Sequence, residues 1–219
     1  MQETKIKGVY KKKNNLLTLN LTPGKSVYHE KVIKSEGNEY REWNPNRSKL
    51  AAALKKGASQ IGIKPGNIIL YLGASTGTTP SHVSDIVGKE GFIYALDFAP
   101  RVVRELVFLS EDRKNIAPIL GDAKQPLSYS HRVSKVDSVY QDIAQHDQVE
   151  IFLRNCDMFL EKGGFGLLCV KSRSIDVTKK PKQVFAEVRQ KLEKALTVVD
   201  YRELAPFEKD HCIYICKKK

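Results

Sequence analysis

The sequence lacks the features of several protein classes. Its 219 residues include only four cysteines, two methionines and one tryptophan, and no apolar run approaches the roughly 18 residues of a membrane-spanning helix. The first 15 residues contain no apolar signal-peptide core, so we expect a cytoplasmic protein with no membrane association. The cysteines form no C-x-x-C pair, so no metal site is predicted, and their apolar surroundings predict free, buried thiols.

Negative charge is also scarce. There are 37 lysines and arginines against 25 aspartates and glutamates, a net charge of +12. Residues 1–55 hold 12 basic and 5 acidic residues, so a quarter of the chain carries over half of the excess. This bias favours a polyanionic partner, RNA or DNA before an acidic membrane, because no basic amphipathic helix accompanies it. The alternative is a basic protein without such a partner.

The first 55 residues predict a small β-rich domain. Apolar and polar residues alternate over 17–21, as in a half-buried strand. Residues 27–33 and 39–43 flank a turn over 35–38, which is typical of a hairpin. A helix is expected to begin near Asn46 or Ser48 and to end at Gly57.

From about residue 64 strands and helices alternate, and we assign residues 56–219 to a second domain. Five strands are expected at 67–72, 92–96, 116–120, 136–140 and 165–170, with helices over 81–87, 100–110, 146–160 and 181–195. The segments 197–204 and 212–216 have no helix between them and should pair antiparallel. The pattern predicts an α/β fold, a Rossmann-like class I methyltransferase with a seven-stranded, mostly parallel sheet and helices on both faces.

A glycine-rich turn follows the first strand of this sheet. It reads Gly73-Ala74-Ser75-Thr76-Gly77-Thr78-Thr79, without the G-x-G-x-x-G pattern of dinucleotide binders. Free N–H groups at a helix N-terminus can hold a carboxylate, and S-adenosylmethionine has a carboxylate but no phosphate. The alternative is an ordinary strand–helix turn.

Acidic residues end the next strands. Asp97 could accept both ribose hydroxyls of a nucleoside or cap the following helix, and Phe98 could pack on adenine. Asp122 could accept from the adenine amino group or form an Asx turn. Because the carboxyl edge of an open α/β sheet binds ligands, these residues predict an S-adenosylmethionine site. The full predicted set is Gly73, Ala74, Gly77, Thr78, Thr79, Asp97, Phe98, Asp122, Ala123, Asp142, Ile143, Ala144 and Gln145.

Several strings resemble the fibrillarin family in its short archaeal form, over essentially the whole chain. They are Arg47-Ser48-Lys49-Leu50-Ala51-Ala52, the glycine turn followed by Ser81-His82-Val83-Ser84-Asp85, Gln141-Asp142-Ile143-Ala144-Gln145 and Asp210-His211-Cys212. The resemblance implies 2′-O-methylation of ribose in rRNA and tRNA, guided by box C/D RNA. It also implies a Nop-family scaffold protein and a kink-turn-binding ribosomal-type protein as partners. The second-strand acid, often Glu in the family, is Asp97 here.

The resemblance also implies a catalytic set. Ribose methyltransferases commonly use Lys-Asp-Lys-Glu, with His in the last place in fibrillarin-like proteins, and the matching residues here are Lys49, Asp142, Lys171 and His211. We expect Lys171 to be the base, held by Asp142, while Lys49 and His211 orient the hydroxyl. A carboxylate alone would raise the pKa of a lysine, so a neighbouring cation is needed for a lysine base.

Two other functions stay open. One is a methyltransferase of the same fold that acts on a base, a protein or a small molecule, although Asp142-Ile143-Ala144-Gln145 replaces the (N/D)-P-P-(F/Y/W) motif of amino-methylating relatives. The other is a non-catalytic RNA-binding subunit. A dehydrogenase is least favoured, since the dinucleotide pattern is missing.

Overall fold

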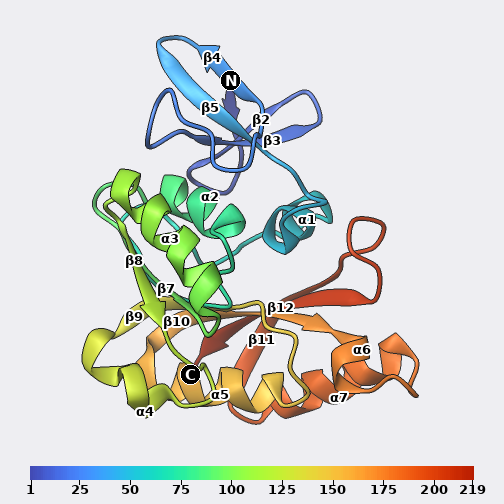
Figure 1. Cartoon of the computed structure of the whole chain (residues 1–219). Helices are drawn as coiled ribbons and strands as arrows, with labels where there is room; N and C mark the ends of the chain where they lie inside the picture. The colour runs from blue at the N-terminus through green and yellow to red at the C-terminus, as the bar shows by residue number, and fades with distance from the viewer.

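Two β-sheets organise the chain, which a computed structural model describes over residues 1–219 (Figure 1). The smaller sheet is antiparallel, with the strand order β1-β2-β3-β5-β4. Its strands are β1 (Gln2–Glu3), β2 (Val9–Lys12), β3 (Asn15–Leu19), β4 (Val32–Ser35) and β5 (Asn38–Trp43). The prediction of a β-rich N-terminal region is therefore confirmed.

The larger sheet has seven strands in the order β11-β12-β10-β9-β6-β7-β8. The strands are β6 (Ile68–Leu72), β7 (Phe92–Asp97), β8 (Ile116–Leu120), β9 (Val136–Gln141), β10 (Leu160–Lys171), β11 (Leu196–Glu203) and β12 (His211–Lys218). Strands β6 to β10 pair in parallel, and β12 is antiparallel to both β10 and β11. The structure thus confirms the mostly parallel sheet and the antiparallel pairing of the last two strands.

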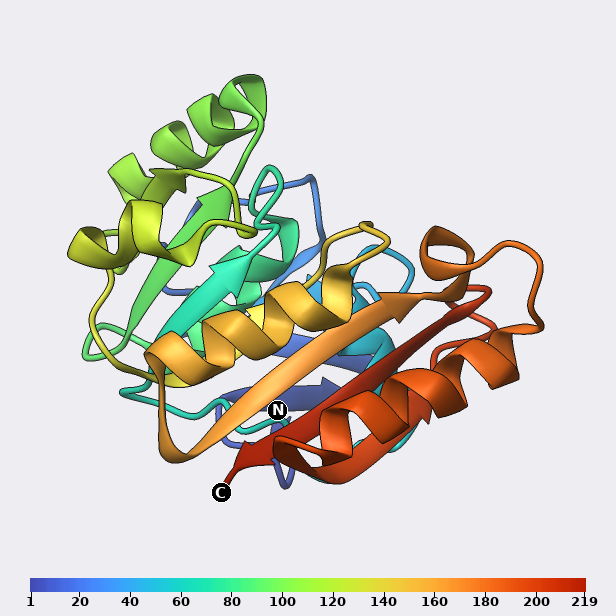
Figure 2. The same ribbon diagram turned by 90° about the horizontal axis from the view of Figure 1, so that it is seen from below.

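Helices cover both faces of this sheet (Figures 1 and 2). The helices are α1 (Lys49–Lys55), α2 (Thr78–Val87), α3 (Pro100–Asp112), α4 (Pro126–Tyr129), η1 (Ser130–Arg132), α5 (Gln148–Phe159), α6 (Ser172–Ile175) and α7 (Pro181–Glu193). Along β6, Ile69 and Tyr71 belong to the hydrophobic cluster that includes residues of α1, α2 and α3. Leu70 and Leu72 belong to the other cluster, which includes residues of α5 and α7. This alternation is the two-residue period of a strand buried on both faces. No helix combines the length and the apolar composition that crossing a membrane requires.

Helix α1 links the two sheets. Its N-cap is Ser48, whose Oγ accepts from the N–H of Ala51, and its buried residues pack in one hydrophobic cluster with side chains of both sheets. The smaller sheet itself ends at Trp43. The division between 1–55 and 56–219 stays a prediction, because the two sheets share this core.

Some element boundaries differ from the expectation. The hairpin strand expected from residue 27 begins only at Val32, because the Glu30 carboxylate accepts from the N–H groups of Val27 and Tyr28 and shapes a loop there. Helix α2 begins at Thr78 rather than Ser81, since Gly77 adopts the left-handed conformation as its N-cap. The short helices α4, η1 and α6 were not predicted.

Candidate active site

The site lies where the strand order reverses. The chain runs from β6 outward to β8 and then returns to the other side of β6 as β9, and ligands bind at the carboxyl ends of such strands. A cleft of about 350 Å³ opens there. Nine predicted residues line it: Gly73, Asp97, Phe98, Asp122, Ala123, Asp142, Ile143, Ala144 and Gln145. Prediction missed Ser75, Leu96, Gly121, Lys124 and Ile151, of which Ser75, Gly121 and Lys124 adjoin the motifs that signalled the site.

Gly73 allows the ends of β6 and β9 to approach each other. Its φ is +81°, and a Cβ there would lie 2.3 Å from the carbonyl oxygen of Asp142. Any side chain would push Asp142 away, so the glycine sets the floor of the cleft.

Asp97 both shapes the turn and faces the cleft. Its Oδ2 accepts from the N–H of Ser75 at 2.9 Å, and its Oδ1 accepts from the N–H of Ala99 at 3.1 Å. Each carboxylate oxygen has a second lone pair for a further donor. Next to it, Phe98 is 69% exposed, which is unusual for a large apolar side chain and leaves a ring face free.

Asp122 forms the turn that the sequence left open as an alternative. Its Oδ1 accepts from the N–H of Lys124 at 2.9 Å, and the residue also lines the cleft. The Asx turn and a ligand contact are therefore compatible, because the carboxylate has further acceptor sites.

Four predicted cofactor residues lie outside the cleft. Ala74 is buried, and a Cβ on Gly77 would lie 2.3 Å from the Leu109 side chain. Thr78 lines a separate groove, and Thr79 donates from its Oγ1 to the Oγ of Ser48 at 3.0 Å. The second half of the glycine turn thus packs the start of α2 against α1 and α3.

An ion pair joins two of the predicted catalytic residues. The Nζ of Lys49, the first residue of α1, lies 2.9 Å from each carboxylate oxygen of Asp142. Burial is the largest single influence and disfavours the ammonium, but Asp142, with smaller contributions from Cys169 and Glu208, outweighs it, so the pKa of Lys49 lies above its ordinary value. Lys49 therefore stays protonated at neutral pH, the form that can donate hydrogen bonds but cannot take up a proton.

Lys171 and His211 lie beside this pair without joining it. They are cross-strand neighbours on β10 and β12. The expectation that Asp142 holds Lys171 is wrong in this structure, where Lys171 is exposed and forms no ion pair. The register explains this. Gln141 pairs with Leu168, so Asp142 lies opposite the position two residues before Lys171, about 6–7 Å away from Lys171 along the strand.

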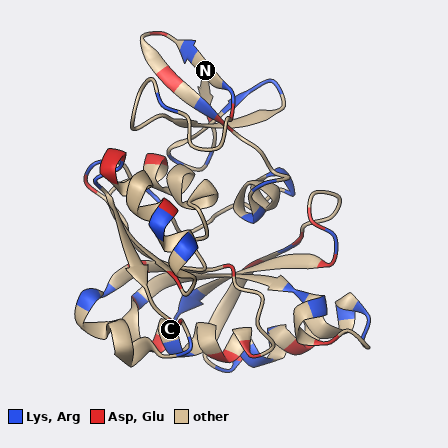
Figure 3. Cartoon of the chain, viewed as in Figure 1, with Lys and Arg blue, Asp and Glu red and all other residues tan.

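Unpaired lysines gather on the smaller sheet and its loops, as the blue segments of Figure 3 indicate. Lys12, Lys13, Lys31 and Lys34 line one hollow of about 640 Å³, to which no acidic side chain contributes. None of the four forms an ion pair, in contrast to Lys124, Lys179 and Lys191 in the helices and loops around the larger sheet. The charge bias of the N-terminal region is therefore concentrated on a surface open to anions.

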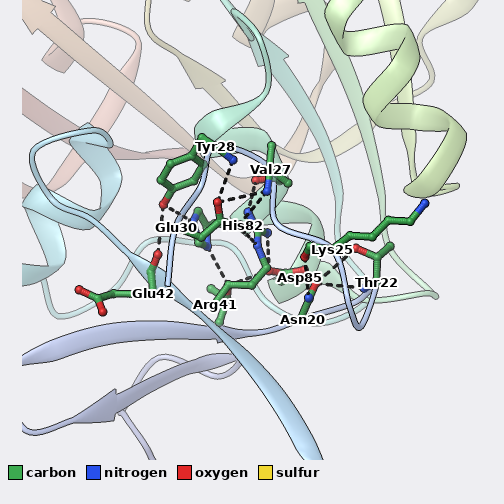
Figure 4. A network of polar contacts seen from close by, with 12 residues as sticks. Asn20, Thr22, Lys25, Val27, Tyr28, Glu30, Arg41, Glu42, His82 and Asp85 are labelled. Carbon is green, nitrogen blue, oxygen red and sulfur yellow. Dashed lines mark hydrogen bonds and ion pairs between the residues drawn. The ribbon is translucent and has the colours of Figure 1, made fainter. Parts of the chain in front are cut away.

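The string Ser81 to Asp85 has a structural role (Figure 4). Asp85 is buried between two guanidiniums: Arg41 donates to its Oδ2 at 2.8 Å and Arg113 donates to its Oδ1 at 2.6 Å. Thr18 donates to Asp85, so its oxygen accepts from Nδ1 of His82 at 2.7 Å, and Nε2 of His82 lies 2.7 Å from the hydroxyl oxygen of Tyr28. This network attaches the smaller sheet to α2.

A seven-stranded sheet in this order, with a ligand cleft at its carboxyl edge, is the Rossmann-like fold of class I methyltransferases. The sequence model of the fibrillarin family matches residues 1–219, and the chain belongs to that family.

Comparison with individual relatives supports this family assignment. The chain is 53% identical to the fibrillarin-like rRNA/tRNA 2′-O-methyltransferase of Pyrococcus abyssi, over 93% of this chain and 89% of that protein. It is similar to the fibrillarin of Aeropyrum pernix, solved with natively bound S-adenosylmethionine, with a TM-score of 0.90 at 45% identity over 98% and 96% of the two chains. A fibrillarin solved in complex with Nop5p gives a TM-score of 0.89 at 39% identity, covering 100% of both chains.

Proposed function

We propose that this chain transfers the methyl group of S-adenosylmethionine to the ribose 2′-hydroxyl of guide-selected nucleotides in rRNA and tRNA. It does so as the catalytic subunit of a box C/D ribonucleoprotein, with a Nop-family scaffold and a kink-turn-binding protein. The observation that carries the proposal is the position of Asp142. This residue lines the cleft and pairs with the ammonium of Lys49 at the edge of the cleft. The names of the relatives and the Nop5p complex support the reaction and the scaffold.

The cleft suits the cofactor. Its volume lies in the range of small-molecule sites, with apolar walls and a few polar groups. We assign Asp97 to the ribose hydroxyls, the exposed ring of Phe98 to the adenine face and Asp122 to the adenine amino group. The carboxylates accept and the ribose and amino groups donate, so the donor and acceptor chemistry matches. Bound S-adenosylmethionine supplies an electrophilic methyl group on a sulfonium.

The residues beside the cleft handle the hydroxyl. A ribose hydroxyl is a weak nucleophile and must lose its proton as it attacks, which calls for a general base. Lys49 is held protonated by Asp142 and can donate to the ribose oxygens. Lys171 has no carboxylate partner and remains our assignment for the base, with His211 orienting the hydroxyl from the adjacent strand.

Incubation with labelled S-adenosylmethionine tests the proposal. The complete assembly of this chain, scaffold, kink-turn protein and box C/D guide should label one guided ribose of a target RNA. Asp142→Ala and Lys171→Ala should each lower the rate at least ~100-fold, the usual effect of a lost acid–base group. Lys182→Ala, an exposed lysine on α7, is the matched control and should retain full activity.

The outcomes separate the alternatives. Label on a base, a protein or a small molecule would identify another methyltransferase class. Binding of S-adenosylmethionine without any methyl transfer would indicate a non-catalytic RNA-binding subunit. Full turnover by Lys171→Ala would remove that residue as the base.

A further inference from the structure

A second carboxylate lies beside the catalytic residues. Glu208 belongs to the connection between β11 and β12, and its Oε2 is 3.8 Å from Nδ1 of His211. The side chains are 28% and 11% exposed, so the contact is partly shielded from water. Neither the strand-end pattern nor the family resemblance singled out Glu208, because it lies in a loop and its role depends on how that loop folds back.

Hydrogen bonds fix the position of this loop. The N–H of Leu204 donates to the carbonyl of His211 at 2.9 Å, and the N–H of Glu208 donates to the carbonyl of Leu204 at 3.2 Å. The carbonyl of Asp210 accepts from the N–H of Ser172, directly after β10. The loop is therefore tied to both strands that carry Lys171 and His211, so Glu208 does not depend on a flexible segment.

The same loop orients the His211 ring. Nδ1 of His211 lies 2.7 Å from the carbonyl oxygen of Lys209, which only accepts, so Nδ1 carries a hydrogen. No other protein group bonds the ring, and in the neutral form Nε2 is left as a free acceptor. The hydrogen bond made by one ring nitrogen decides the role of the other.

Glu208 is the carboxylate that reaches the His211 ring, since Asp142 is already paired with Lys49. Besides burial and Asp142, the field of Glu208 also acts on Lys49 and favours its ammonium form. Glu208 thus lies where it can act on Lys49 and on the Nδ1–H of His211 together.

We propose that Glu208 is a positioning residue that supports the Lys209 carbonyl in holding His211 in the Nδ1–H tautomer, so that Nε2 stays free to accept from a donor group of the RNA substrate. The role of Nε2 rests on the proposed function, whereas the tautomer is a property of the folded chain alone. Carboxylates that orient metal-bound histidines affect metal affinity or activity about 10–100-fold when replaced, and for His211 we expect an effect of about tenfold.

The tautomer can be measured on the full chain without RNA. Long-range ¹H–¹⁵N spectra of the ¹⁵N-labelled protein, with His211 assigned by loss of its signals in His211→Asn, should show the Nδ1–H form in the wild type. Glu208→Gln should raise the Nε2–H fraction several-fold, while Glu208→Asp, which keeps the charge, should stay close to the wild type. Glu111→Gln, an exposed and uncontacted acid on α3, is the charge-matched control and should change nothing.

Methylation by the complete assembly provides the second readout. Glu208→Gln should lower kcat about tenfold with the KM for S-adenosylmethionine unchanged, and Glu208→Asp should recover most of the loss. An unchanged tautomer in Glu208→Gln, or a changed tautomer with wild-type kcat, would overturn the proposal. If the wild-type assembly methylates no ribose, the proposed function fails, and the tautomer measurement still decides whether Glu208 holds His211.

Discussion

At the scale of single residues, Asp97 shows how one carboxylate can serve a turn and a ligand together. Its oxygens each accept one backbone N–H, from Ser75 and Ala99, and keep lone pairs for the cleft. Asp97 is not the helix cap that the sequence left open, because the N-cap of α3 is Ala99 and has no side-chain cap; the turn contacts of Asp97 leave the ribose role open.

We predict that Asp97→Ala weakens S-adenosylmethionine binding by about 1–3 kcal/mol, because hydrogen bonds to a charged acceptor are lost. Isothermal titration calorimetry on the isolated chain measures this loss. Asp157→Ala, an exposed aspartate on α5, serves as the control. Equal affinities for the Asp97 variant and the wild type would place that carboxylate outside the site.

His82 gives a prediction about pH. Burial, and then the charges of Arg41 and Arg113, hold its pKa well below the ordinary value, so the folded chain keeps it neutral while the unfolded chain protonates it near pH 6.5. The unfolded state then binds more protons, and stability falls as the pH drops below about 6.5.

Between pH 7 and 5.5 the loss should be about 1 kcal/mol from this residue, measurable by urea unfolding at each pH. His82→Asn should flatten the dependence in this window, whereas His146→Gln, at an exposed position, should leave it unchanged. A dependence that persists in His82→Asn would assign it to another group.

At the scale of elements, the contact between the smaller sheet and α2 is held by charge as well as by apolar packing. The Asp85 carboxylate and the guanidiniums of Arg41 and Arg113 are at most 1% exposed. Removing one partner of such a group leaves a buried charge uncompensated.

Asp85→Ala should therefore destabilise the chain by about 3–5 kcal/mol in denaturant unfolding. Asp112→Ala breaks the Lys25–Asp112 pair, whose side chains are 58% and 41% exposed, and should cost less than about 1 kcal/mol. Similar small losses in both variants would show that the buried network contributes little.

The same elements show what the sequence could predict. The strand–helix alternation from about residue 64, the glycine turn after the first strand and the acids after the next strands were sufficient for the sheet and for nine lining residues of the cleft, because all three are local sequence patterns. The sequence could not show that Thr78 and Thr79 lie outside the cleft, since their placement depends on how the start of α2 packs against α1 and α3. The Lys49–Asp142 pair joins residues 93 positions apart, and only the folded register shows why Lys171 is not the partner.

At the scale of the whole molecule, the excess positive charge provides a surface suited to phosphates. The hollow formed by Lys12, Lys13, Lys31 and Lys34 can contact phosphates, and such contacts are salt-sensitive and carry little sequence preference. Under the proposed function we expect the assembly to position the ribose, since an error of ~1 Å can cost ~100-fold in rate.

We therefore predict that the isolated chain, given S-adenosylmethionine and naked target RNA at physiological salt, methylates negligibly. Adding the scaffold, the kink-turn protein and the guide should restore methylation at one ribose, mapped by primer extension. Efficient site-specific methylation by the lone chain would show that it carries its own RNA recognition.

The buried network also has a consequence for the order of synthesis. Arg41 leaves the ribosome 44 residues before Asp85 and 72 before Arg113, yet in the interior Asp85 is paired with both guanidiniums. Until those later residues emerge, the nascent smaller sheet exposes the polar face that it will bury against α2. Its final docking therefore waits for the end of α3, so the first-made part of the chain is not the first to reach its native contacts.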